Sequence, residues 1–134
     1  MIRGMMSRPL ASGLLATALT AGLVALAPSA SAAYEVVGGY HGSDLQACRT
    51  TTDGGEPAVR FRLDSRDAGH VHSGGLFRTR ENGATARFTV KPAVGRVSAP
   101  RTVVVRSTDE IGWFVSDPNS GTGGDLRRGS LPRC

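Results

Sequence analysis

Apolar residues in this chain recur at every second position, and this alternation limits the folds that it can adopt. Residues 58–63 (AVRFRL) place three apolar side chains on one side of an extended strand, with Arg60 and Arg62 on the other. No segment after residue 33 sustains the apolar period of an amphipathic helix. The pattern therefore predicts an all-β domain.

Short runs rich in Val, Phe, Ile and Thr are separated by Gly, Pro, Asn, Asp and Ser, which is typical of strands joined by turns. Two polar, glycine-rich stretches, 41–57 and 116–125, are predicted to be loops. We predict a small antiparallel β-sandwich or barrel of about seven short strands. The candidate strands are 34–38, 58–63, 69–73, 75–80, 84–90, 94–98, 101–106 and 111–116, with a short one near 125–128.

Asn82-Gly83 is the strongest turn signal in the sequence, because both central residues of a type I′ hairpin turn need positive φ. The two phenylalanines of this hairpin would share its core face, and its three arginines, Arg78, Arg80 and Arg87, would share the opposite face. Counting back from the turn predicts the cross-strand pairs Glu81–Ala84, Thr79–Ala86 and Phe77–Phe88.

The first third of the chain has the order of a secretory signal peptide. Arg3 and Arg8 precede an uncharged apolar stretch, 10–27, and small residues suited to signal peptidase follow it. We therefore predict a cleaved signal peptide over 1–33, with cleavage after Ala32 or Ala33, and a single secreted, extracellular domain over 34–134. An uncleaved membrane anchor is the alternative, since the apolar stretch is about long enough to span a bilayer. After cleavage we expect no membrane association.

Two cysteines, Cys48 and Cys134, are predicted to form one disulfide, as is usual for a small exported domain. Closing a loop of nearly the whole domain would contribute on the order of 4 kcal/mol of stability. Two free thiols or an intermolecular bridge are the alternatives. Fifteen of the 16 basic residues are arginine, and Ala and Gly are abundant. This usage is typical of a GC-rich genome and, with the leader, of small exported bacterial proteins.

Three histidines are candidate metal ligands. His70 and His72 project on the same side of an extended strand, so their imidazoles could converge on zinc or copper. A third ligand would have to come from His41, Asp67 or Asp44, with His41 the best candidate. The alternative is that His70 and His72 face solvent while Val71 points inward.

Five arginines could form a face for an anionic partner if the two β units that carry them are neighbours in one sheet. Arginine binds carboxylate and phosphate groups in a bidentate manner, so an acidic extracellular polymer is a conceivable partner. Nucleic acid is not expected, because no exposed aromatic residues alternate with these arginines. The alternative is that these arginines only form a solvent-exposed face and bind no partner. The five are Arg60, Arg62, Arg78, Arg80 and Arg87.

Motifs of common enzyme classes are missing from the sequence, including G-x-S-x-G, H-E-x-x-H and the phosphate-binding loop. Residues 87–96 (RFTVKPAVGR) are similar to the strand that carries the catalytic glutamate in guanyl-type bacterial ribonucleases. Some of these enzymes also join an early cysteine to a terminal one. Arg87 stands where the base would be and no histidine follows His72, so no catalytic residue carries over.

We therefore expect a non-enzymatic extracellular module that binds another molecule, a protein or an anionic polymer, and needs no cofactor. A secreted copper- or zinc-binding protein built on His70 and His72 is the first alternative. A small secreted hydrolase that uses one of the histidines is the second.

Overall fold

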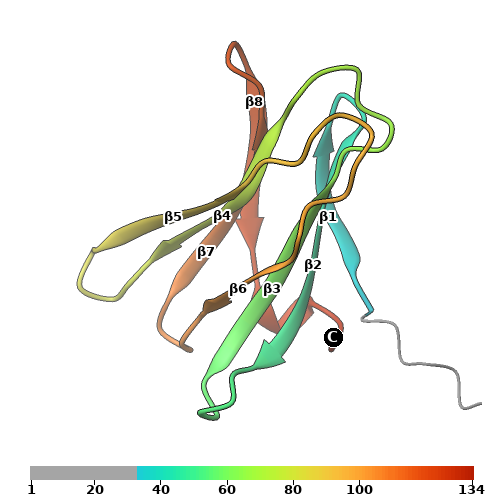
Figure 1. The fold of residues 1–134 in the computed structure, drawn as a ribbon. Helices are drawn as coiled ribbons and strands as arrows, with labels where there is room; N and C mark the ends of the chain where they lie inside the picture. Colours follow the sequence, from blue (N-terminus) through green and yellow to red (C-terminus); the bar gives the residue numbers. More distant parts are fainter. Residues whose placement is uncertain (1–32) are drawn as a thin grey trace, which may run out of the picture.

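Eight strands form two antiparallel sheets that pack face to face (Figure 1). The computed structural model describes residues 33–134, so the predicted signal peptide lies outside the described residues except for Ala33. The elements are β1 (Glu35–Tyr40), β2 (Ser43–Thr51), β3 (Pro57–Asp64), β4 (Ser73–Thr79), β5 (Thr85–Val90), β6 (Arg101–Val104), β7 (Glu110–Ser116), β8 (Gly121–Leu126) and a 3-10 turn, η1 (Arg128–Ser130). Within these residues no helix has the length and apolar character needed to cross a membrane.

The strands are ordered β1-β2-β3-β6 in one sheet and β5-β4-β7-β8 in the other. The chain crosses between the sheets three times: from β3 to β4, from β5 to β6, and from β6 to β7. Both sheets therefore contain a pair of neighbours that are distant in sequence, β3 with β6 and β4 with β7. The all-β prediction is confirmed, and the fold is a sandwich of eight strands rather than a barrel.

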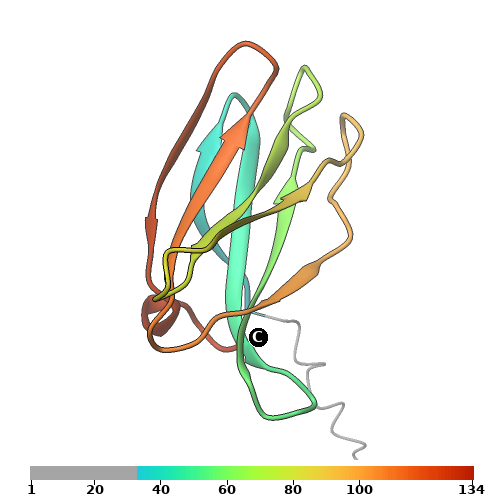
Figure 2. The same ribbon diagram turned by 90° about the vertical axis from the view of Figure 1, so that its left-hand side faces the viewer.

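The core lies between the inner faces of the two sheets, which Figure 2 presents in a second view. Phe61 and Leu63 of β3 are fully buried, as the alternation in 58–63 predicts, and they join Leu45, Leu76 and Val115 from three other strands. Removing each such side chain from water contributes about 1.5–3 kcal/mol.

Trp113 packs against this core from β7. A Cβ built on Gly38 of β1 would lie 2.0 Å from the Trp113 ring. Glycine at position 38 therefore allows the backbone of one sheet to approach an aromatic ring of the other.

Four sequence predictions about secondary structure are wrong. The predicted loop 41–57 contains all of β2, and the predicted loop 116–125 contains most of β8. Their apolar content is low because the outward side chains of β2 are mostly polar and because half of the residues of β8 are glycines. The predicted strand 69–73 is irregular up to Ser73. The predicted strand 94–98 is likewise irregular, because Gly95 adopts a φ of 78°, and only Val97 forms a bridge there.

The hairpin at Asn82-Gly83 exists, but its turn has three residues rather than two. The Gly83 N–H donates to the Arg80 carbonyl, and the Arg80 N–H donates to the Ala84 carbonyl. Gly83 has a φ of 84°, whereas Asn82 is not among the residues with positive φ. This is a type I turn followed by a left-handed glycine. The Asn82 side chain accepts the Ala84 N–H at 3.0 Å.

The extra turn residue shifts the register by one and corrects the predicted faces. Phe77 pairs with Arg87, and Leu76 pairs with Phe88. Leu76 is the buried partner, whereas Phe77 is 37% exposed on the outer face. A slip of one residue exchanges the two faces of a strand, because successive side chains alternate.

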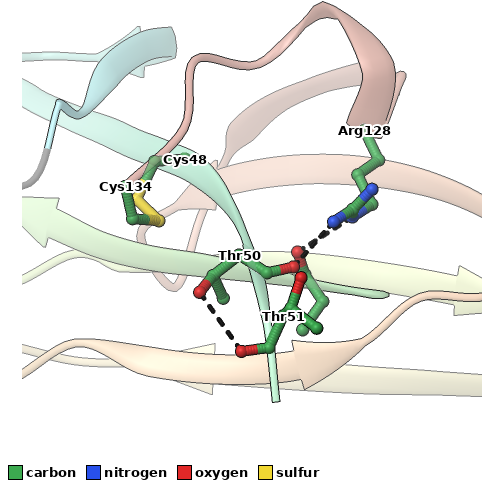
Figure 3. The surroundings of a disulfide bond; sticks show 6 residues. Cys48, Thr50, Thr51, Arg128 and Cys134 are labelled. Atoms are coloured by element: carbon green, nitrogen blue, oxygen red, sulfur yellow. Dashed lines mark hydrogen bonds between the residues drawn. A yellow bond between two sulfur atoms is a disulfide. The ribbon is translucent and has the colours of Figure 1, made fainter. Parts of the chain in front are cut away.

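The C-terminal segment is fastened to the first sheet beside β2 (Figure 3). Cys134 forms the predicted disulfide with Cys48, across 86 positions of sequence. The Arg49 N–H donates to the Pro132 carbonyl, and the Cys134 N–H donates to the Arg49 carbonyl. The Arg128 guanidinium donates to the carbonyl oxygens of Thr50 at 2.6 Å and of Ala58 at 3.0 Å.

We expect Cys48→Ala/Cys134→Ala to lower the free energy of unfolding by about 4.5 kcal/mol, because the open chain regains the entropy of a long loop. Urea unfolding of the mature domain measures this change. Reduced wild-type protein should unfold at the same urea concentration as the double variant, and reductant should not affect the variant. Equal midpoints for oxidised wild type and the variant would contradict the stabilising role of the bridge.

Gly83→Ala should destabilise the domain by about 1–2 kcal/mol, because a residue with a Cβ resists the left-handed conformation. No heavy atom lies within 4 Å of the added Cβ, so the effect is one of backbone conformation. Gly69→Ala is the matched control, since Gly69 also has open space around it but lacks the left-handed φ. Thermal unfolding of both variants compares them, and equal melting temperatures would refute the observed turn.

Candidate binding surface

The predicted metal ligands do not converge in the structure. His72 is buried, with 1% of its surface exposed, whereas His70 and Val71 are exposed. This corrects the expectation that Val71 points inward beside two solvent-facing histidines. His41 lies in the β1–β2 turn, and its ring contacts Tyr40, which also contacts His72 from the edge. Among residues 33–134, no three His, Cys, Asp or Glu side chains are grouped so that they could hold a metal ion.

His72 belongs to a buried hydrogen-bond network that joins three segments. Its Nδ1 lies 2.7 Å from the Ser43 hydroxyl at the start of β2. The Ser43 hydroxyl lies 2.8 Å from that of Ser65, directly after β3. The network therefore ties the irregular segment before β4 to the first sheet.

The Ser43–His72 pair has the composition of a nucleophile and its base, but a substrate has no access to it. Ser43 and Ser65 are fully buried, and His72 is 1% exposed. The His72 Nε2 atom is also buried and has no hydrogen-bond partner among the described residues. Nucleophilic catalysis requires the hydroxyl to reach a substrate atom, which this burial prevents. The geometry gives the hydrolase alternative no support.

The five candidate arginines are distributed over three places. Arg60 and Arg62 lie on the outer face of β3, as predicted, and the Arg62 guanidinium covers the Tyr34 ring at 4.1 Å. Arg87 lies on the outer face of the other sheet. Because β3 and β4 belong to different sheets, these five residues form no continuous face.

Arg78 and Arg80 point to the inner side of their sheet, which corrects the predicted face. The Arg78 guanidinium donates to the Val104 carbonyl of the facing sheet at 2.9 Å and lies over the Phe88 ring. Burial lowers the pKa of Arg78, and the nearby Arg80 charge lowers it further. Arg80 forms an ion pair with the buried carboxylate of Asp109. The side chains of both arginines are therefore used in contacts within the domain, at the margin where the two sheets meet.

Two phenylalanines and one arginine lie together on the outer face of sheet β5-β4-β7-β8. The rings of Phe77 and Phe114 are 4.9 Å apart, and the Arg87 guanidinium lies 4.0 Å from the Phe114 centroid. Arg87 forms no ion pair with any described carboxylate. A guanidinium held by aromatic rings can still use its N–H groups for a partner.

A groove of about 740 Å³ runs across this outer face from β5 to β8. The cross-strand neighbours of Phe114 are Gly75 on one side and Gly123 on the other, so no side chain flanks it in its own row. The ionisable groups of the groove are Arg87 and two exposed carboxylates, Glu110 and Asp125. We call this groove, which Phe77, Phe114 and Arg87 line, the outer groove.

A second hollow, of about 630 Å³, lies at the end of the sandwich near η1. Its lining includes Arg128 and Asp109, which are already engaged. Arg128 donates to two backbone carbonyls, and Asp109 accepts from Arg80 and from the Arg106 N–H. This hollow is built from groups that hold the fold, so it is a weaker candidate for a ligand.

Sequence reasoning missed the outer groove because it placed Phe77 in the core. The three-residue turn moves Phe77 outward, and β7 brings Phe114 beside it from a distant part of the chain. The sequence signals that could have identified the site are the glycines of β8, which keep the region beside Phe114 free of side chains. Ser43 and Ser65 carry no pattern that distinguishes them from loop serines.

Comparison of the chain with protein-family models, with curated proteins and with solved structures yields no match.

His72→Ala should lower the free energy of unfolding by about 2–4 kcal/mol, because it leaves a cavity and removes the partner of a buried hydroxyl. His70→Ala is the matched control and should change it by no more than about 0.5 kcal/mol, since His70 is exposed. Chemical unfolding of both variants measures the difference. Similar values for the two variants would show that the buried network does not stabilise the fold.

Proposed function

We propose that the mature chain is an exported, non-enzymatic module that binds another extracellular protein through the outer groove. The observation that carries this proposal is the group formed by Phe77, Phe114 and Arg87. It presents an exposed aromatic ring beside an arginine that has no carboxylate partner among the described residues. Aromatic residues and arginine are enriched at the centres of protein interfaces.

Export is supported by the leader sequence and by the disulfide. A bridge between Cys48 and Cys134 persists in an oxidising compartment, whereas cytosolic reductants keep most thiols reduced. It also fastens the C-terminal segment, from which Arg128 donates to carbonyl oxygens of β2 and β3. The proposed mature form is therefore suited to an extracellular environment.

Phe77 has the exposure expected of an interface residue. The large apolar residues exposed in the described part of the chain are Val36, Val71, Val94 and Phe77, and Phe77 alone among them is aromatic. The three valines lie outside the outer groove. Its exposed ring and the groove around it favour this face as the contact surface.

The charges of the outer groove favour a polypeptide over an anionic polymer. Arg87 supplies one positive charge, and Glu110 and Asp125 supply two negative charges. A polyanion would be repelled by the two carboxylates, whereas a protein segment can present both apolar and basic side chains. The anionic-polymer alternative also depended on a continuous arginine face, and the five arginines lie in three separate places.

A heptapeptide phage library, with heparin and polygalacturonate as the polymer arm, tests this proposal on the mature domain. We expect peptides to be enriched and their affinity to fall about tenfold for Phe77→Ser, since an interface aromatic is lost. Arg87→Gln should weaken them by a smaller factor. Val36→Ser is the matched control, because Val36 is an exposed apolar residue on the other sheet.

Thermal unfolding must first show that each variant remains folded at the assay temperature. Peptides that bind Phe77→Ser as well as wild type would refute the outer groove as the contact surface. Heparin or polygalacturonate binding that depends on salt, but has the same affinity in Phe77→Ser, Arg87→Gln and wild type, would instead favour the anionic-polymer alternative.

A further inference from the structure

We propose that the outer groove takes its protein partner as an extended segment that pairs with the free edge of β8 and adds a fifth strand to the sheet. This inference rests on the proposed function and specifies the geometry of the contact. In such strand addition, backbone hydrogen bonds supply affinity and alternate side chains supply specificity.

The four edge strands of the sandwich differ in how they are protected against pairing with the backbone of another chain. β1 carries a register irregularity between Val36 and Gly38, and the C-terminal segment pairs with β2 where β1 begins. β6 is short, with four residues. β5 carries Arg87 and is followed by Lys91 and Pro92. Bulges, shortness, charges and proline are the usual means of protecting an edge.

β8 has fewer of these protections, because its one charged residue is Asp125, although Arg127 and Arg128 follow the strand. Its six residues pair with β7 in unbroken register, and they include no lysine, arginine or proline. Three of the six, Gly121, Gly123 and Gly124, are exposed glycines. In Figure 2, β8 runs along the left margin of the molecule with no further element outside it. Its outer edge is therefore accessible to a second backbone.

The outward positions of β8 indicate which side chains an added strand would carry. They are Gly121, Gly123 and Asp125, in the rows of Ser116, Phe114 and Gly112. Phe77 and Arg87 cover the Phe114 ring, which is only 6% exposed, and Gly123 adds no side chain from the β8 side. An aromatic side chain on a neighbouring strand commonly covers such an edge glycine.

Besides the aromatic residue opposite Gly123, the carboxylate of Asp125 sets a second requirement for the sequence of the added strand. Asp125 is exposed and takes part in no hydrogen bond or ion pair with the described residues. A lysine or arginine two positions from the aromatic residue would lie opposite Asp125, because alternate residues share a face. The added strand should therefore read basic–x–aromatic when it runs antiparallel to β8, as all pairs in this sheet do.

The probe is the capped peptide Ac-TKTFTVT-NH2, tested on the mature domain by NMR titration. Two versions are N-methylated, one at the lysine, phenylalanine and valine amides, and the other at the intervening threonine amides. Alternate amides of a strand point to opposite edges, so only one set can donate to β8. We expect one version to bind about tenfold more weakly and the other to bind about as well as the unmodified peptide.

Charge reversal tests the proposed register. Asp125→Lys should weaken this peptide by about fivefold and favour the version with glutamate in place of lysine by a similar factor. Asp53→Lys is the matched control, because Asp53 is an exposed aspartate in the β2–β3 turn. The peptide Ac-TKFTVTT-NH2, with the same composition but a broken alternation, should bind more weakly than the probe.

Equal effects of the two N-methylated versions would overturn strand addition. If Phe77→Ser still weakened peptide binding in that case, the outer groove would remain the contact surface and only its backbone geometry would be wrong. A probe that shows no binding at all, or a domain that pairs with its own copy through β8 in sedimentation experiments, would also refute a peptide as the occupant.

Discussion

The contact between the two inner sheet faces determines where every other side chain of this domain can lie. Phe61 and Leu63 of β3 pack with Leu76 of β4 and Val115 of β7, and all four are fully buried. Because strands alternate their side chains, fixing these residues inward fixes their neighbours outward. Arg60 and Arg62 therefore lie on one outer face, and Phe77 and Arg87 lie on the other. The outer groove is thus a consequence of how the core is packed.

Most departures from simple alternation occur at the margins of this core. Arg78 is an inward residue, but it lies where the sheets meet at the β5–β6 side, so its guanidinium reaches the Val104 carbonyl. His72 is buried at another margin and shares hydrogen bonds with Ser43. Polar groups are tolerated at both places because each has a partner, although Arg78 Nε and His72 Nε2 have none among the described residues. The apolar core residues, in contrast, come mainly from the middle of the strands.

The turn at Asn82-Gly83 illustrates how a local detail decides the candidate site. The dipeptide correctly indicates a hairpin, and its glycine does adopt a left-handed φ. A two-residue turn would have put Phe77 in the core, whereas the observed three-residue turn puts it in the outer groove. Leu76 takes the core position because an apolar residue is available one step earlier. The sequence allows both registers, and burial of Leu76 against the first sheet selects one.

Local sequence was sufficient for the features that depend on neighbouring residues. It predicted the all-β class, the alternation of β3, the hairpin between β4 and β5, and the disulfide, which follows from having two cysteines. Only the tertiary structure decided that β3 and β4 lie in different sheets, that His72 is buried away from His70, and that Phe114 lies beside Phe77 and Arg87. These outcomes depend on pairing between strands distant in sequence, which residue periodicity does not encode.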